Sequence, residues 1–344
     1  MSKLFSVIIP CYNAAELVDT ALGSVIGQTL DRSMYEVIAV DDASTDDTLT
    51  HLNRWAQRFP ETVRVITYNT NLRQGGARNR AIKEAEGDYI CFLDADDWME
   101  ADALCSFRIG TGSGYDIVTA LFKENSEHSG QDNTSGDQRE AGIQKVFGGP
   151  DIREYISYDL GFVWSSVYRR SMIINNDIWF PEHLAYEDIY WQRLVKFYIG
   201  SACIIDKVTH HYYNNPGSTM NRRNAPYHID RLTSYEALLS QYLRRGLLNL
   251  YYREIMNDTF EVYLYNSYFM FFTMMDEIPD VYARIRETIY KYFPDWETAY
   301  DDTEIPVVFR YMLKYMKKAR KATPEELMPF KETILEIISE EDQK

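Results

Sequence analysis

The sequence predicts an α/β fold: a mostly parallel β-sheet flanked by helices, followed by a helical C-terminal region. Over residues 5–120, short apolar runs alternate with amphipathic segments that have helical spacing. Strands that alternate with helices imply right-handed crossovers, and such crossovers place neighbouring strands parallel. From about residue 228 to the end, helical patterns dominate.

The expected elements follow one another closely in the first part. We expect strands at 5–9, 36–41, 63–68, 89–93 and 117–120, and helices at 15–28, 44–58, 76–86 and 187–198. Pro10 ends the first strand. Ser44 to Asp47 looks like a capping box, which explains Asp46 and Asp47 as helix-start residues.

We predict one domain over 1–225, with halves at 1–120 and 145–225, and a helical region over 226–344. Residues 123–142 are rich in Ser, Asn, Gly and Asp and have no apolar period, which is typical of a mobile loop or an insertion. In the helical region, apolar side chains from Phe260 to Met275 recur at helical spacing, which favours a bundle core or an oligomer interface.

Composition narrows the class of protein. The chain has 344 residues, 45% of them hydrophobic, so it can bury a large core. A net charge of -16 argues against a nucleic-acid partner. The four cysteines lack metal-finger spacing, which favours reduced thiols. The first strand begins within four residues of Met1, leaving no room for a signal peptide, so we expect a cytoplasmic protein, free or peripheral at the inner face of the membrane.

Acidic side chains follow two of the predicted strands. Asp41 and Asp42 come after the second strand, and Asp94, Asp96 and Asp97 after the fourth. In an open parallel sheet, ligands bind beyond the carboxyl ends of the strands. Carboxylates can lie beside a phosphorylated ligand only where a cation offsets the repulsion. The clusters therefore predict a divalent cation and a phosphorylated ligand, and helix capping is the plainer alternative for each cluster alone.

Two other known motifs begin with acids spaced like Asp94, Asp96 and Asp97, but the residues that follow do not fit either of them. A calcium-binding EF-hand loop would have a Glu where Cys105 stands, and Trp98 and Met99 interrupt it earlier. A phosphatase of the aspartyl-phosphate type usually has Thr or Val where this chain has Trp98.

Four segments in this order resemble family 2 glycosyltransferases with the GT-A fold, a Rossmann-like architecture: Val7–Asn13, Val40–Asp46, Asn71–Asn79 and Phe92–Asp97. The resemblance is strong over about residues 4–120, which would form the nucleotide-binding half. It implies a nucleotide-sugar donor, usually a UDP-sugar, and Mn²⁺ or Mg²⁺ as cofactor.

The resemblance also implies roles for individual side chains. The residues it places at the sugar donor are Pro10, Tyr12, Asn13, Asp42, Asn71, Arg78, Asp94 and Glu187. Asp96 would ligate the metal and Asp188 would be the catalytic base. A histidine would complete the metal shell: we name His211 and leave His210 as the alternative, since two adjacent residues of a strand cannot both point inward. Arg222 and Arg223 would clamp the diphosphate.

A weaker match covers Trp164–Arg169 and Tyr186–Asp188, so residues 145–225 would form the acceptor side. The function implied is inverting transfer of a sugar to a hydroxyl of a saccharide, lipid-linked or polyol-phosphate acceptor, of the kind that builds bacterial surface polysaccharides or decorates teichoic acids. The alternatives are a sugar-nucleotidyltransferase and a non-catalytic scaffold subunit. The basic segment from Arg310 to Lys321 is either a solvated helix face or a peripheral membrane contact.

Overall fold

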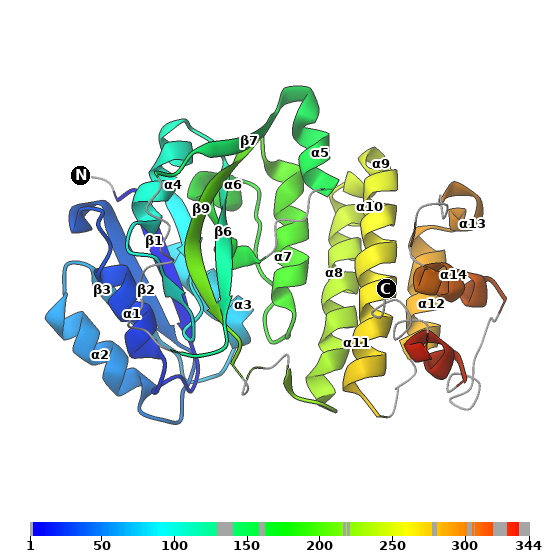
Figure 1. Ribbon diagram of the computed structural model, residues 1–344, viewed down its shortest axis with the longest axis horizontal. Helices are drawn as coiled ribbons and strands as arrows, with labels where there is room; N and C mark the ends of the chain where they lie inside the picture. The colour runs from blue at the N-terminus through cyan, green and yellow to red at the C-terminus, as the bar shows by residue number, and fades with distance from the viewer. Residues whose placement is uncertain are drawn as a thin grey trace. The chain divides into compact units, whose positions relative to one another are not determined.

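The computed structural model describes residues 3–128, 140–157, 162–215, 218, 221–276, 281–300, 305, 307–318 and 329–336. The chain forms two compact units, Met1–Ser218 and Thr219–Lys344. We predicted the change to a helical region after residue 225. The first unit contains the strands and the second consists of helices (Figure 1).

Four parallel strands form one side of the sheet in the first unit, in the order β3-β2-β1-β4. Their bounds are Phe5–Cys11 for β1, Tyr35–Asp41 for β2, Val63–Thr67 for β3 and Tyr89–Phe92 for β4. All four lie where the apolar runs predicted them.

Both faces of this parallel block are covered, which explains the continuous apolar runs. Every residue of β1 and β2 is buried. On β1, Val7 and Ile9 point into a core that also contains Val18 and Leu22 of α1 (Val18–Ile26). The other face packs against α3 (Arg73–Glu84). The carboxyl ends of the strands are thereby fixed as one edge.

The other side of the sheet differs from the mostly parallel arrangement that we predicted. Its strands are β5 (Trp98–Met99), β6 (Ile117–Asn125), β7 (Ile143–Gly148), β8 (Ser166–Arg169) and β9 (Ser201–Tyr213). β8 lies between β4 and β6 and is antiparallel to both, whereas β6 and β9 are parallel. The sheet is therefore mixed, because a four-residue strand from far along the chain joins its two halves.

The predicted loop over 123–142 is partly wrong. β6 continues through Asn125 and pairs with β9 as far as Tyr213. The residues of β6 after Ala120 are mostly exposed or half-buried, and several of them are polar. This part of the sequence therefore lacks the apolar run that is typical of a buried strand. Residues 129–139 lie outside the described residues.

The remaining helices of the first unit are α2 (Thr48–Arg58), α4 (Ala103–Gly112), α5 (Ile152–Ser157), α6 (Arg170–Asn175) and α7 (Glu187–Val195). Short 3₁₀ turns occur at Arg32–Met34, Gly149–Asp151, Val163–Ser165 and Lys196–Tyr198. At the start of α2, the carboxylate of Asp46 accepts the backbone N–H of Thr48 at 3.0 Å. Asp46 thus serves the helix start, but the predicted capping box is wrong, because the N-cap is Asp47 without a side-chain cap bond and Ser44 accepts the N–H of Asn13.

The helices of the second unit are α8 (Asp230–Arg244), α9 (Leu247–Leu250), α10 (Tyr252–Asp258), a π-helical turn (Thr259–Tyr265), α11 (Asn266–Met274), α12 (Val281–Tyr292), α13 (Trp296–Ala299) and α14 (Val307–Lys318). A 3₁₀ turn at Pro226–Ile229 precedes them. Phe260, Tyr263 and Phe271 are fully buried, so the helical apolar pattern marks the core of this unit. Within the described part of the chain, no helix is both long and apolar enough to span a bilayer.

The basic segment that we predicted from Arg310 to Lys321 falls mainly on α14. Met312, Leu313 and Met316 are buried, while Lys314 is exposed. The segment is an amphipathic helix with its apolar side in the core of the unit. Residues 319–321 lie outside the described residues.

Candidate active site

The loops that follow β1 and β2 are tied to each other at the carboxyl edge of the sheet. The side-chain oxygen of Asn13 accepts the N–H of Thr45 at 2.8 Å, and the N–H of Asn13 donates to Ser44 Oγ at 3.1 Å. Next to them, Tyr12 is 52% exposed, whereas Pro10 before it is buried in β1. A fixed loop with an exposed ring beside it can stack on a planar ligand.

Asp42 holds the loop that follows β3. Its Oδ1 accepts the N–H of Leu72 at 2.8 Å, and Asn71 accepts the N–H of Arg73 at 2.9 Å. Burial raises the pKa of Asp42 above its ordinary value, against the lowering effect of those backbone N–H groups. Asp42 and Asn71, which we predicted at the sugar donor with Tyr12, follow β2 and β3 at the carboxyl edge, and part of their hydrogen-bonding capacity holds the protein's own loops.

The second acidic cluster lies directly after β4. Asp96 accepts a hydrogen bond from the Asn215 amide at 3.1 Å, and Asp97 accepts the N–H of Tyr213 at 2.8 Å. Burial, and then the charge of Asp94, raise the pKa of both Asp96 and Asp97. Asp97 Oδ2 is buried without a hydrogen-bond partner among the described residues. The cluster carries more negative charge than its surroundings offset.

A single arginine links this cluster to the other half of the unit. Arg78, on α3, is 2% exposed. Its Nη2 donates to Asp94 at 2.7 Å and its Nη1 donates to Glu187 at 2.5 Å. The rings of Phe92 and Phe180 lie 5.7 and 5.4 Å from the guanidinium carbon. We predicted Arg78 beside the nucleotide, and the structure places it in a buried double ion pair.

Glu187 and Asp188 form the first turn of α7. Glu187 is buried, and this burial raises the pKa of its carboxyl, with Arg78 opposing the shift. Asp188 is only half-buried, and its Oδ1 accepts the N–H of Ile189 at 2.9 Å. Tyr186 before them has φ +60, a left-handed conformation that is costly for a residue with a side chain and is enriched at functional sites.

Two residues of α3 that the sequence did not single out for this purpose hold the segment leading to α7. Asn79 donates to the carbonyl of Phe180 and accepts its N–H, each at 2.9 Å. A Cβ at Gly75 would lie 2.4 Å from the Pro181 carbonyl and 3.1 Å from Glu187 Cγ. Gly75 therefore allows close approach between two parts of the protein.

His211, which we predicted as a metal ligand, is engaged elsewhere. Its Nε2 lies 2.7 Å from Glu100 Oε1 and its Nδ1 lies 3.2 Å from the Asn125 amide. Its ring stacks on Trp98 with centroids 5.1 Å apart. Both ring nitrogens therefore have partners within the protein, and this arrangement gives no support to His211 as a metal ligand.

His210 and His211 are both buried, because β9 is covered on both faces. Our expectation that only one of them could face inward is therefore wrong. They are strand residues, because β9 continues through Tyr213. Residues 216 and 217 lie outside the described residues. Arg222 and Arg223 belong to the second unit, where Arg223 pairs with Asp276 at 3.0 Å.

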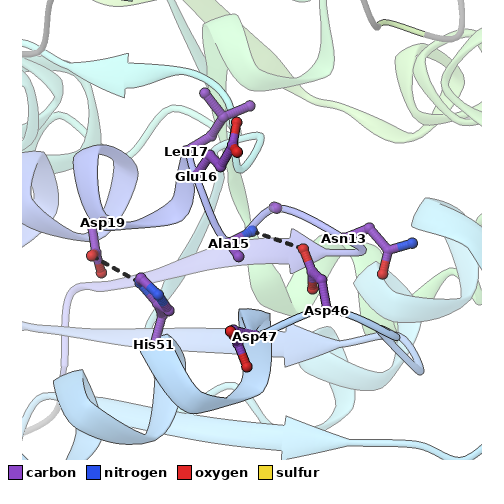
Figure 2. A pocket seen from close by; sticks show the side chains of 9 residues that line it. Asn13, Ala15, Glu16, Leu17, Asp19, Asp46, Asp47 and His51 are labelled. Carbon is purple, nitrogen blue, oxygen red and sulfur yellow. Dashed lines mark hydrogen bonds and ion pairs between the residues drawn. The ribbon is translucent and has the colours of Figure 1, made fainter.

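A cavity of about 730 Å³ opens beside the β1 and β2 loops. Its lining residues are Asn13, Ala14, Ala15, Glu16, Leu17, Asp19, Asp46, Asp47 and His51. Figure 2 shows His51 against Asp19, with 2.9 Å between Nδ1 and Oδ2, and Asp46 against the N–H of Ala15. The cavity shares Asn13 with the predicted site but none of the acids after β4, so we assign it no catalytic part.

The acids after β4 fit a divalent cation. Carboxylate oxygens are the ligands that Mg²⁺ prefers, and Mg²⁺ is commonly held by one or two carboxylates together with phosphate oxygens of a substrate. Burial, and then the charge of Asp94, raise the pKa of Asp96, and Asp97 Oδ2 has no hydrogen-bond partner among the described residues, so a cation here would stabilise the ionised carboxylates. Among the described residues no three His, Cys, Asp or Glu side chains converge as a complete metal shell. A cation here would need ligands from a bound substrate.

Part of the chain matches a family of known proteins. The model of glycosyl transferase family 2 matches residues 6–145. The chain is 44% identical over 100 residues to the poly(ribitol-phosphate) beta-glucosyltransferase of Bacillus spizizenii. This alignment covers 29% of this chain and 16% of that protein. It is 30% identical over 235 residues to the uncharacterized glycosyltransferase YibD of Escherichia coli, which covers 63% of this chain and 64% of that protein.

Among solved structures, residues 1–349 of Staphylococcus aureus TarS match with a TM-score of 0.67 at 21% identity, covering 98% of this chain and 91% of that chain. The same protein in complex with UDP-GlcNAc matches with a TM-score of 0.62. TarS is a poly(ribitol-phosphate) beta-N-acetylglucosaminyltransferase, and the aligned sequence covers 30% of its full length. The likeness confirms the predicted GT-A fold. Residues 6–145 of this chain thus match the model of glycosyl transferase family 2, and the chain shares its fold with TarS.

Proposed function

We propose that this chain is an inverting glycosyltransferase that moves a sugar from a nucleotide sugar, a UDP-sugar, to a hydroxyl group of a polysaccharide, glycolipid or polyol-phosphate acceptor. The observation that carries the proposal is the Arg78 double ion pair. It joins Asp94, at the edge where a nucleotide would bind, to Glu187, which directly precedes the half-buried Asp188.

In this proposal the sugar donor lies along the loops after β1, β2 and β4. Tyr12 stacks on the base, and Asp42, Asn13 and Asn71 bound the pocket for base and ribose. The support is that these side chains share one edge of the sheet and that their loops are fixed by hydrogen bonds to one another. Rigid loops bind a ligand without losing much conformational entropy.

Asp188 is the proposed general base. The acceptor oxygen forms a bond to the anomeric carbon, the bond from that carbon to the diphosphate oxygen breaks, and the hydroxyl proton passes to the Asp188 carboxylate. Such a base contributes about 10²–10⁴-fold to a rate. Asp188 suits this role because it is partly exposed, and because it follows Glu187, whose side chain is bound by Arg78.

The diphosphate leaves with its negative charge, beside a cluster of acids. A divalent cation, Mn²⁺ or Mg²⁺, supplies Lewis-acid stabilisation of that charge when bound. Asp96 would hold it together with Asp94, and the electrostatic imbalance after β4 supports this assignment. Asp97 keeps the loop in place through Tyr213.

The relatives point to the acceptor class. Two of them are named for transfer to poly(ribitol phosphate), one as a glucosyl- and one as an N-acetylglucosaminyltransferase. We therefore propose a UDP-hexose or UDP-N-acetylhexosamine as sugar donor and a polyol-phosphate polymer of the bacterial surface as first acceptor to test. The chain would act in the cytoplasm, where activated sugars are made. A peripheral contact with the inner face of the membrane and a homo-oligomer formed through the helical region are further parts of this proposal.

The test is a panel of nucleotide sugars assayed with and without Mn²⁺, with released UDP as the readout. One UDP-sugar should be hydrolysed slowly, and poly(ribitol phosphate) should accelerate UDP release. Absence of UDP release from every sugar nucleotide, with and without acceptor, would refute the proposal. A sugar-nucleotidyltransferase would instead consume a sugar phosphate and a nucleoside triphosphate, and a scaffold subunit would bind UDP without turnover.

A further inference from the structure

We infer that Arg78 is a positioning residue that holds the catalytic base by tying the carboxylate after β4 to the start of α7, rather than a ligand of the nucleotide. The inference rests on the proposed function, because it concerns how Asp188 is placed. It differs from what the family resemblance implies for Arg78, which is a place beside the nucleotide.

Both ends of the Arg78 guanidinium are already used. Nη1 and Nη2 each donate to a different carboxylate, at 2.5 and 2.7 Å, and the side chain is 2% exposed. Phe92 and Phe180 lie near the guanidinium carbon. A planar fork that is fixed at two points and enclosed by rings can act as a rigid strut between the groups it binds. It has little exposed surface to offer a phosphate.

The strut connects the two sides of the proposed reaction. Asp94 is fixed to the parallel block, because it follows β4 directly. Glu187 is the first residue of α7, and Asp188 is the second. Within one helical turn the backbone leaves little freedom between neighbours, so a fixed Glu187 side chain limits where the Asp188 carboxylate can lie. The strut therefore sets the distance between the nucleotide edge and the base.

The helix α3 contacts the segment from Phe180 to Glu187, which leads into α7, at three places. Gly75 approaches the Pro181 carbonyl, Asn79 pairs with the backbone of Phe180, and Arg78 binds Glu187. The first two contacts are neutral and hold the chain before α7. Arg78 alone of the three also reaches a carboxylate at the end of β4. Removing its fork should leave the segment in place but loosen the first turn of α7.

The test compares Arg78→Lys with Glu187→Gln. Lysine keeps the charge but is a point donor that cannot hold two carboxylates in fixed geometry. A misplacement of a catalytic group by 1 Å lowers a rate by about 100-fold. We expect kcat for transfer to fall by about that factor in Arg78→Lys, with UDP affinity and acceptor KM retained. Glu187→Gln should lower kcat in the same way, and the double variant should be no worse than Arg78→Lys.

Arg64→Lys is the matched control. The Arg64 guanidinium also lies between two carboxylates from different elements, 3.3 Å from Glu36 of β2 and 3.7 Å from Glu84 of α3, but its side chain is 40% exposed. We expect its kcat to equal that of the unchanged protein. An equal loss of kcat in Arg64→Lys would mean that any weakened ion pair on α3 has the effect, and the inference would fall.

Two results separate this inference from the proposed function. Hydrogen exchange of the amides in Glu187–Val195 needs no substrate, and it should speed up in Arg78→Lys but not in Arg64→Lys; unchanged exchange overturns the inference even if the protein shows no transfer. Inactivity of the unchanged protein toward all sugar nucleotides refutes the function alone. A loss of UDP affinity in Arg78→Lys, with kcat retained at saturating sugar donor, would make Arg78 a nucleotide ligand.

Discussion

The two units bury different kinds of side chain. In the first unit, buried residues include Asp41, Asp42, Asp97 and Glu187 as well as Arg78. In the described part of the second unit, no Asp, Glu, Lys or Arg side chain is buried, and the core is largely aromatic and aliphatic. Its main internal ion pair, Arg284 with Glu236 at 2.7 Å, is partly exposed.

The difference shows that the cost of removing charged side chains from water falls on the first unit. Removing an ion from water costs several kcal/mol even after relaxation, and a buried pair is often no more stable than apolar residues of the same volume. Aromatic packing, as in the second unit, stabilises a core without that desolvation cost. Buried charges that gather at one edge of a sheet therefore point to a functional site.

The largest expected effect concerns the base. Asp188→Asn should lower the rate of sugar transfer by about 10²–10⁴-fold, because the amide cannot take the acceptor proton. UDP affinity, measured by calorimetry, should stay that of the unchanged protein. Asp151→Asn, at an exposed acid of the same unit, is the control and should transfer normally. Near-normal turnover in Asp188→Asn would break the link between this acid and the chemistry.

The second effect is on stability and sharpens the contrast. Phe260 is fully buried and stacks on Tyr300 at 4.4 Å. Phe260→Ala should lower the free energy of unfolding by about 3–5 kcal/mol, because it leaves a cavity. Phe269→Ala, at a ring that is 40% exposed, should change it by less than about 0.5 kcal/mol. If folded Phe260→Ala protein lost UDP affinity, the second unit would also contribute to the sugar-donor site.

The third effect tests the acids after β4. Asp96→Ala should weaken UDP binding in the presence of Mn²⁺ by about 10- to 100-fold, since changes around a metal site typically have that effect. With a chelator present, the variant and the unchanged protein should bind UDP alike. Unchanged Mn²⁺-dependent affinity in Asp96→Ala would remove this residue from the metal site.

The smallest effect is a pH dependence. Burial, and then Asp94 and Asp96, raise the pKa of Asp97 well above its ordinary 3.8. Between the unfolded and the native pKa the native state holds more protons, so stability falls as pH rises through this window, by about 1.4 kcal/mol for each pH unit that the window spans. Asp97→Asn should remove this loss, and its stability advantage should grow from pH 4 upward. A constant difference between the two proteins from pH 4 to 7 would contradict the prediction.

The sequence predicted the parallel block well, because each of its strands is a short apolar run between helices with clear starts. It also placed Asp42 and Asp96 at strand ends, where topology alone brings them to one edge. It could not predict β8, whose four residues carry no period that separates them from the surrounding aromatic stretch. In the mixed half, the sequence therefore predicted only the start of β6, at residues 117–120, and not its antiparallel partners.

The side-chain partners were harder to predict than the elements. Arg78 and Glu187 are 109 positions apart, and no local pattern relates them. For His211, the family resemblance predicted a metal ligand. In the structure His211 is buried on β9, and its two ring nitrogens have Glu100 and Asn125 as partners. Motifs locate a site along the chain, but the fate of each polar atom depends on neighbours from distant segments.

The position of β8 also determines the order in which the molecule can assemble on the ribosome. β1 to β4 are complete once residue 92 has emerged, and they pair only with one another and with β8. β6 follows soon after but has partners only in β8 and β9, which begin at Ser166 and Ser201. Domains fold as synthesis proceeds at about 5–20 residues per second. The edge of β4 that pairs with β8 therefore has no partner strand among the described residues until Ser166 has been made, and an unpaired edge is where a chaperone or another copy can bind.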